Sequence, residues 1–169
     1  IVVLYGGRSP DRLISEVSSE QVAEALTTDN VIRLNLNGIY NFGDKAIKNF
    51  SQIYKLYQEG RLSEFDIDQE LEITDSVIEI CKLADIVFLS THGGIGENGK
   101  LQALLDICNI NYTGNGYQSN AISLDKKLSK RLVSTVGIKV PYEYMGENEF
   151  VFPLVIKPND TAPDLEDEK

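Results

Sequence analysis

Short apolar runs separated by helical patterns are the main feature of this sequence. Residues 1–5 and 86–89 are continuous apolar runs, and residues 31–36 resemble a further strand. A continuous apolar run is typical of a strand buried on both faces of a parallel sheet. Because strands and helices alternate through short links, the sequence predicts an α/β fold with an open, Rossmann-like parallel sheet flanked by helices.

Apolar residues at helical spacing predict the helices between these strands. Ser9-Pro10 offers a helix cap and a first-turn proline, and the residues that follow predict one buried helical face: Ile14, Val17, Val22, Ala25 and Leu26. Residues 77–83 predict a second helix. The i, i+3, i+4, i+7 pattern predicts a third from Leu101, Leu104, Leu105 and Cys108. After a short strand near residues 111–113, one long helix is predicted from Ala121, Leu124, Leu128 and Leu132.

Residues 37–75 and the end of the chain are less regular. In the first region one helical face is predicted before Gly60, followed by an acidic connector: Ile47, Phe50, Tyr54 and Tyr57. Beyond Gly137 two proline-bounded strands are predicted, at residues 140–141 and 153–158. They indicate a second unit, so we predict domains at residues 1–122 and 123–169. The tail from residue 162 has almost no apolar content and predicts no fixed structure of its own.

The composition narrows the class of protein. Hydrophobic residues make up 42% and charged residues 25%, as in an ordinary globular protein. The formal net charge of −10 argues against nucleic-acid partners, because their binders carry a basic face. No apolar run approaches the ~20 residues of a membrane span, so no membrane partner is expected. Cys81 and Cys108 lack CxxC spacing and indicate small buried thiols in a reducing compartment, the cytoplasm.

Three glycine-rich turns suggest a binding edge. Gly6-Gly7, residues 92–99 and residues 114–116 each join a predicted strand to a predicted helix. In a parallel sheet such turns share the carboxyl edge, where helix starts favour an anion or carboxylate. The turns predict a small acidic ligand there, although glycines that merely turn the chain remain the alternative. A nicotinamide fingerprint, a phosphate loop, a His-rich zinc site and a G-x-S-x-G elbow are all missing from the sequence.

Five elements of the sequence resemble the D-alanine–D-alanine ligase family. The turn from Thr91 to Gln102 resembles that family's "HGxxGEDGxxQ" signature, and residues 112–116 resemble its "YTGSG". Residues 123–126 resemble the "MDK" element, residues 155–158 the "VKP" strand, and residues 4–9 the opening "LxGGxS". The five occur in family order, whereas residues 37–75 match nothing in the pattern and are expected to be a variable insertion.

The resemblance implies an ATP-grasp enzyme that joins two D-alanine molecules for peptidoglycan precursor synthesis. ATP would phosphorylate the first carboxylate, Mg²⁺ would bridge the ATP phosphates, and the second amine would attack the acyl phosphate. The expected partners are therefore D-amino acids, ATP and a second copy in a homodimer. Two alternatives stay open: a related ligase that uses D-serine or D-lactate, and a non-catalytic α/β module that binds a carboxylate or forms a dimer.

The resemblance also assigns roles on the substrate side. His92 matches a catalytic histidine near the acyl phosphate, and Gly93 lies in the same substrate turn. Glu97 matches a carboxylate that shapes the substrate site, although it also suits a helix start. Asp11 stands where the family has a glutamate that holds the first substrate's ammonium group; the alternative is a first-turn acid that stabilises the helix dipole.

On the nucleotide side, Lys126 and Lys157 match the family's two ATP-binding lysines. Without the resemblance, Lys126 would be interpreted as an exposed helix lysine. The segment after Lys157 departs from the family because it continues into Ala162-Pro163-Asp164 instead of a glycine- and serine-rich phosphate loop. The resemblance places the magnesium ligands further along, so none is assigned here, and we expect the chain to stop before such an enzyme is complete. Residues 123–169 would then be the start of an ATP-grasp α+β domain.

Overall fold

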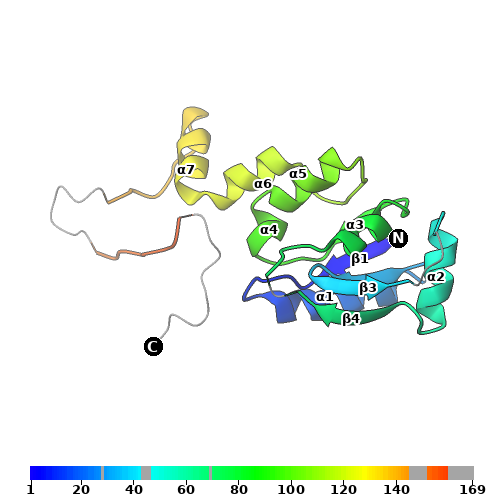
Figure 1. The fold of residues 1–169 in the computed structure, drawn as a ribbon. Helices are drawn as coiled ribbons and strands as arrows, with labels where there is room; N and C mark the ends of the chain where they lie inside the picture. The colour runs from blue at the N-terminus through cyan, green and yellow to red at the C-terminus, as the bar shows by residue number, and fades with distance from the viewer. Residues whose placement is uncertain (28, 43–46, 69, 145–151, 160–169) are drawn as a thin grey trace.

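The computed structural model describes residues 1–27, 29–42, 47–68, 70–144 and 152–159 (Figure 1). Its centre is a parallel sheet in the order β2-β1-β5, made of β1 (Val2–Tyr5), β2 (Ile32–Asn35) and β5 (Val87–Leu89). Tyr112 extends it through a single parallel bridge to Val87, where a short strand was predicted. The open parallel sheet predicted from the apolar runs is confirmed.

The two faces of this sheet are different because alternate side chains of a strand point to opposite sides. On one face, the strands and the helices α3 (Asp75–Cys81) and α5 (Lys100–Ile107) form the apolar core, in which these side chains are fully buried: Val2, Leu4, Ile32, Leu34, Val77, Ile80, Leu101 and Leu105. Both helices were predicted. On the other face Val3 lies between Arg33 and Phe88, under α1 (Arg12–Ala25). Figure 1 shows α1 and α3 on opposite sides of β1.

Helix α1 only partly presents the face that the sequence predicted: Val22 and Leu26 are partly buried, but Ala25 is exposed. Its buried residues are Ser15 and Ser19, whereas Ile14 and Val17, which we expected to be buried, are 50% and 57% exposed. The prediction was wrong for Ile14 and Val17 because it assumed an apolar surface beneath this part of the helix. The surface beneath α1 instead contains the guanidinium group of Arg33.

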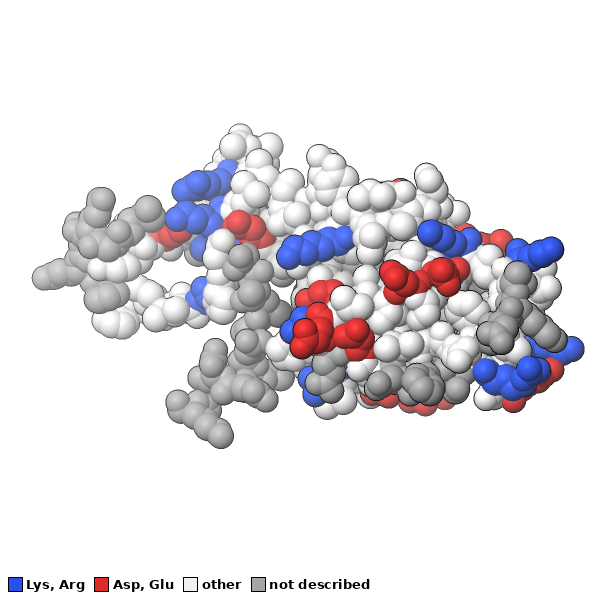
Figure 2. Space-filling view, in the orientation of Figure 1, with Lys and Arg blue, Asp and Glu red and all other residues white. Residues whose placement is uncertain are grey.

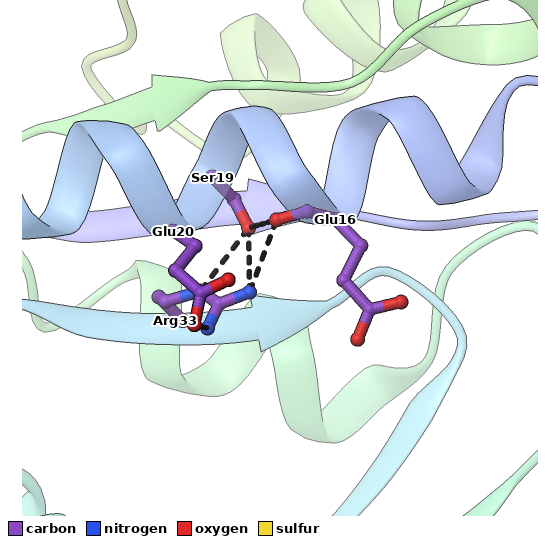
Figure 3. Close-up of polar contacts among 4 residues, drawn as sticks. All are labelled: Glu16, Ser19, Glu20 and Arg33. Carbon is purple, nitrogen blue, oxygen red and sulfur yellow. Dashed lines mark hydrogen bonds and ion pairs between the residues drawn. The ribbon is translucent and has the colours of Figure 1, made fainter.

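Arg33 explains the orientation of α1 (Figure 3). Its Nε and Nη2 donate to Ser19 Oγ at 3.1 and 2.9 Å, and Nη2 also donates to the carbonyl oxygen of Glu16 at 3.1 Å. The guanidinium carbon lies 5.0 Å from the centre of the Tyr5 ring. A charge removed from water without hydrogen-bond partners is expensive, so small serines face Arg33, and Leu13, Ile14 and Val17 face outward.

Residues 37–75 contain two strands that the sequence analysis missed. β3 (Gly38–Asn41) and β4 (Ser63–Ile67) form an antiparallel pair. Thr74 Oγ1 donates to the carbonyl oxygen of Gly38 at 2.6 Å and ties this pair to the start of α3. Helix α2 (Phe50–Gln58) lies where a helix was predicted, but its fully buried residue is Ile53, which the predicted face did not include, and Tyr57 is exposed.

The predicted long helix after Gly116 is two helices. α6 (Tyr117–Leu124) ends at Asp125, and α7 (Lys126–Thr135) begins directly after it. Asp125 has extended backbone angles, and its Oδ1 accepts a 2.8 Å hydrogen bond from the backbone N–H of Leu128. This hydrogen bond is the main reason why the pKa of Asp125 is lowered. An aspartate that caps a new helix start in this way competes with continuation of the preceding helix.

The strands predicted after Gly137 do not form. Residues 140–144 and 154–158 have no regular secondary structure, and Val155 and Ile156 are 74% and 91% exposed. A strand requires a neighbouring strand for its backbone groups, and none lies beside these segments in the described part of the chain. The tail from residue 162 lies outside the described residues. Among those described, no helix combines the length and apolar character needed to cross a membrane.

Candidate active site

Two turns that follow β1 and β5 meet at the carboxyl edge of the sheet, because these strands are parallel neighbours. The hydroxyl of Ser15, on the buried face of α1, joins them. Its Oγ accepts a 2.9 Å hydrogen bond from the backbone N–H of Gly6 and donates a 2.8 Å bond to the carbonyl oxygen of Ser90. One buried side chain therefore fixes the separation of the two turns.

The second turn approaches Asp11 closely at Gly93. Gly93 has φ of 67°, and a Cβ placed on it would collide with Ser9 Oγ and lie 3.2 Å from Asp11 Oδ2. Only glycine fits such a position without strain. Asp11 is the N-cap residue of α1, and its backbone N–H donates to Ser9 Oγ at 3.2 Å. Helix α1 thus begins two residues later than predicted, after the turn at Ser9-Pro10.

His92, next to Gly93 in the chain, contacts α1 at Ser18, about two turns beyond Asp11. Its Nε2 is 3.3 Å from Ser18 Oγ, and both side chains are half-buried. The Asp11 side chain makes no capping hydrogen bond to the helix. The structure therefore brings together three of the predicted site residues, Asp11, His92 and Gly93, between the start of α1 and the turn after β5.

Glu97 ends the short helix α4 (Gly94–Glu97), which follows this turn. No hydrogen bond or ion pair joins Glu97 to Asp11 or His92 among the described residues. The turn itself is held by Gln102, whose Nε2 donates to the carbonyl oxygen of Gly96 at 2.7 Å. Thr91 Oγ1 and Gln102 Oε1 are buried without a hydrogen-bond partner.

The predicted nucleotide lysines lie on two segments that Asn159 connects. The backbone N–H of Lys126 donates to the carbonyl oxygen of Asn159 at 2.9 Å, and the Asn159 side-chain amide donates to Asp125 at 3.0 Å. Lys157, two residues before Asn159, is exposed. Figure 2 shows basic side chains over α7, whose sequence contains Lys126, Lys127, Lys130 and Arg131. Figure 1 shows α7 clear of the sheet and of α1.

A metal site needs several ligating side chains close together. In the described ranges no three His, Cys, Asp or Glu side chains are grouped so that they could hold an ion. Mg²⁺ prefers several oxygen ligands in octahedral geometry. The described residues do not supply such a set of oxygen ligands.

The sequence analysis missed the serines of α1. Ser15, Ser18 and Ser19 are spaced i, i+3, i+4, which places them on one helical face. That spacing is visible in the sequence, but the prediction for this helix rested on its apolar residues. The missed serines are the residues that connect α1 to the turn after β5 and to Arg33.

Comparison with known proteins identifies the chain's relatives. The protein-family model described as "D-ala D-ala ligase N-terminus" matches residues 1–115. A D-alanine–D-alanine ligase of Lacticaseibacillus casei is 35% identical, over 94% of this chain and 50% of that protein. One from Aquifex aeolicus is 33% identical over 94% of this chain and 46% of its own length. The chain spans about half the length of the curated relatives it matches.

Solved structures share the fold. A D-alanine–D-alanine ligase of Bacillus anthracis matches with a TM-score of 0.61 at 23% identity, over 97% of this chain and 46% of that one. The VanG D-Ala:D-Ser ligase of Enterococcus faecalis matches with a TM-score of 0.54 at 22% identity, over 83% of this chain and 43% of that one. Because both kinds of ligase share the fold, the fold alone does not distinguish between their substrates.

Proposed function

The chain belongs to the D-alanine–D-alanine ligase N-terminal family, and from that premise we propose that it supplies the substrate side of an ATP-dependent ligase that joins two D-alanine molecules. The observation that most supports this proposal is the approach of Gly93 to the Asp11 carboxylate, with His92 beside them, at the carboxyl edge of the sheet. That edge is where open parallel sheets bind their ligands.

Each of these residues has a task in the proposed reaction. The Asp11 carboxylate accepts hydrogen bonds from the ammonium group of the first D-alanine, and charge-assisted bonds of this kind are strong. His92 donates a hydrogen bond to the anionic oxygens that the reaction develops on the same substrate. Gly93, which has no side chain, lets the turn after β5 pack closely against Ser9 and Asp11, and Glu97 shapes the second-substrate side.

Lys126 and Lys157 are the proposed ATP-binding residues. ATP supplies the phosphoryl group that converts the first carboxylate into an acyl phosphate, from which the second amine displaces phosphate. The hydrogen bonds of Asn159 support this assignment, because they connect the segments that carry the two lysines. The basic character of α7 favours phosphate binding on a chain whose net charge is −10. Catalysis requires this basic segment to approach Asp11 and His92.

The remaining expectations stay predictions for the complete protein. They are Mg²⁺ as a partner of ATP, a cytoplasmic location and a boundary between domains at residues 122 and 123. The helix break at Asp125 favours that boundary. A homodimer is also proposed. Helix α1 supports it with apolar side chains that are at least half exposed: Leu13, Ile14 and Val17. Light scattering on the full-length gene product tests the dimer.

The activity is tested by phosphate release from ATP, measured on the full-length gene product with and without D-alanine. D-Alanine-dependent release is expected in the unmodified protein and in Glu24→Ala, a control on the exposed side of α1. Asp11→Ala is expected to lose most of the D-alanine-dependent phosphate release at a low concentration of D-alanine. D-Serine and D-lactate offered beside D-alanine identify the second substrate. A non-catalytic module would release no phosphate in any of these mixtures.

The nucleotide assignment has its own test. Calorimetric titration with ATP and Mg²⁺ is expected to show an affinity that collapses in Lys157→Ala. Lys139→Ala is the matched control, since Lys139 is also exposed and lies outside the proposed site. Equal affinities in the two variants would remove Lys157 from the nucleotide site.

A further inference from the structure

Ser18 belongs to a face of α1 on which each serine makes a contact outside its own turn of helix. Ser15 joins the turns after β1 and β5, and Ser19 accepts hydrogen bonds from Arg33. Ser18 lies between them on the same face, and its hydroxyl contacts His92. Its partner is therefore a side chain of the proposed active site.

The helix that carries Ser18 is held firmly against the sheet. Arg33 of β2 makes three hydrogen bonds to the Ser19 hydroxyl and the Glu16 carbonyl (Figure 3). Ser15 is fully buried and holds Gly6 on one side and Ser90 on the other. These anchors lie within one turn of Ser18 on either side, so the Ser18 hydroxyl has a defined position relative to the residues that precede His92.

We propose that Ser18 is a positioning residue that sets the tautomer of His92. The Ser18 hydroxyl donates to Nε2, so that Nε2 is the acceptor and the proton of the neutral ring resides on Nδ1. The 3.3 Å separation is long for a hydrogen bond.

The direction of this hydrogen bond follows from the chemistry of the ligand, and here the inference rests on the proposed function. A carboxylate or an acyl phosphate offers only acceptor oxygens, so the histidine nitrogen that faces it must carry a proton. Nδ1 makes no hydrogen bond to the described part of the chain and is the nitrogen left for the substrate. If Nε2 held the proton and donated to Ser18, a lone pair on Nδ1 would face the anion and repel it.

The test uses the fact that His92 is the only histidine in the sequence. In full-length protein whose histidines carry ¹⁵N, the ring nitrogens of His92 report the tautomer at alkaline pH, where a histidine ring is neutral. The unmodified protein is expected to show a protonated Nδ1 and an unprotonated Nε2. Ser18→Ala is expected to shift the proton toward Nε2, and Ser18→Thr, which keeps the hydroxyl, to retain the original pattern.

A kinetic measurement adds a second readout. Ser18→Ala is expected to lower kcat for D-alanine ligation by about 10- to 100-fold, at or below the low end of the contribution of a proton donor itself, because His92 is retained. The KM for ATP is expected to change little, and Ser18→Thr is expected to recover most of kcat. Ser51→Ala, at an exposed serine in α2, away from the proposed site residues, is the control. A proton on Nε2 in the unmodified protein, or nitrogen shifts that do not change in Ser18→Ala, would overturn the inference. If the shifts change as expected in a protein without ligase activity, the positioning role stands and the proposed function fails.

Discussion

The hydroxyl of Ser15 donates a 2.8 Å hydrogen bond to the carbonyl oxygen of Ser90, 75 residues away in the sequence. The same Oγ accepts from the backbone N–H of Gly6, so one fully buried oxygen satisfies two backbone groups at the edge of the sheet. Removal of the hydroxyl takes this partner away from both groups at once. The bond therefore links the stability of the fold to the spacing of the proposed site.

We predict that Ser15→Ala lowers the free energy of unfolding by about 1–3 kcal/mol, because a donor and an acceptor stay buried without partners. The measurement is urea unfolding followed by circular dichroism. Ser134→Ala is the control: its exposed hydroxyl bonds to the carbonyl oxygen of Arg131 in the same helix, and its loss is expected to change stability by less than about 0.5 kcal/mol. Equal effects in the two variants would show that water replaces the Ser15 hydroxyl.

A second prediction compares Gly93→Ala with Gly60→Ala. The φ angles are nearly equal, 67° and 65°, but Gly93 also has ψ of −172°, a backbone region that is essentially confined to glycine. Space is different: a Cβ on Gly93 meets Ser9 and Asp11, whereas one on Gly60 meets nothing within 4 Å. Gly60→Ala is expected to lower the free energy of unfolding by about 1–2 kcal/mol through backbone strain alone. Gly93→Ala is expected to lower the free energy of unfolding by more than this and to weaken D-alanine binding in the full-length protein, measured by calorimetry. Equal losses of stability in the two variants, with unchanged D-alanine binding, would refute the close packing of this turn.

The outcome for α1 shows where sequence reasoning succeeds and where it stops. The strands at residues 1–5 and 86–89 were predictable because continuous apolar runs require burial on both faces. The face of α1 was not, since it depends on Arg33, a residue of another element whose charge must find partners. The break at Asp125 was missed because an aspartate suits both the middle of an exposed helix and a new cap, and only the Leu128 contact distinguishes them.

The candidate site shows the same division. Asp11, His92 and Gly93 could be placed together from the rule that turns after parallel strands share an edge, together with the resemblance to a family. Ser18 could not, because its contact with His92 requires the orientation of α1 that the apolar pattern obscured. The β3–β4 pair was missed because both strands are short and carry polar residues.

A third prediction separates two contributions of Arg33 to stability, its hydrogen bonds to α1 and its ion pair with Glu20. Arg33→Met keeps a long apolar stem but removes the bonds to Ser19 and to the Glu16 carbonyl, and hydrogen bonds from charged groups contribute about 1.5–3 kcal/mol. The ion pair with Glu20 is 4.0 Å long, and the Glu20 side chain is 62% exposed, so Glu20→Gln is expected to cost less than about 0.5 kcal/mol. Chemical unfolding of both variants measures the difference. A larger loss in Glu20→Gln than in Arg33→Met would contradict the role given to the serine face.

A fourth prediction concerns Cys81, the thiol in the core. Burial raises the pKa of Cys81 from its ordinary value of 9.0 to about 12, so folding favours the neutral thiol. Its contribution to stability is fully present below the ordinary value and is lost as pH rises from there toward the folded pKa. Between about pH 8 and pH 10 the unmodified protein is therefore expected to lose about 1 kcal/mol more stability than Cys81→Ala. Urea unfolding at the two pH values measures this; parallel losses would mean that the thiol is accessible to water.

The last prediction concerns Asp11, which stands where the family has a glutamate. An aspartate carboxylate lies one methylene closer to the backbone, a difference of roughly 1.5 Å, yet the close approach of Gly93 brings the second turn within reach of Asp11 Oδ2. We therefore expect Asp11 to hold the ammonium group of the first substrate. In the full-length protein, Asp11→Ala should raise the KM for the first D-amino acid far more than the KM for ATP, and Asp11→Glu should retain or improve activity. Steady-state kinetics with each substrate varied in turn makes the comparison. If Asp11→Ala leaves both constants unchanged and only lowers the melting temperature, Asp11 is a helix-end acid that contributes about 0.3–1 kcal/mol through the helix dipole.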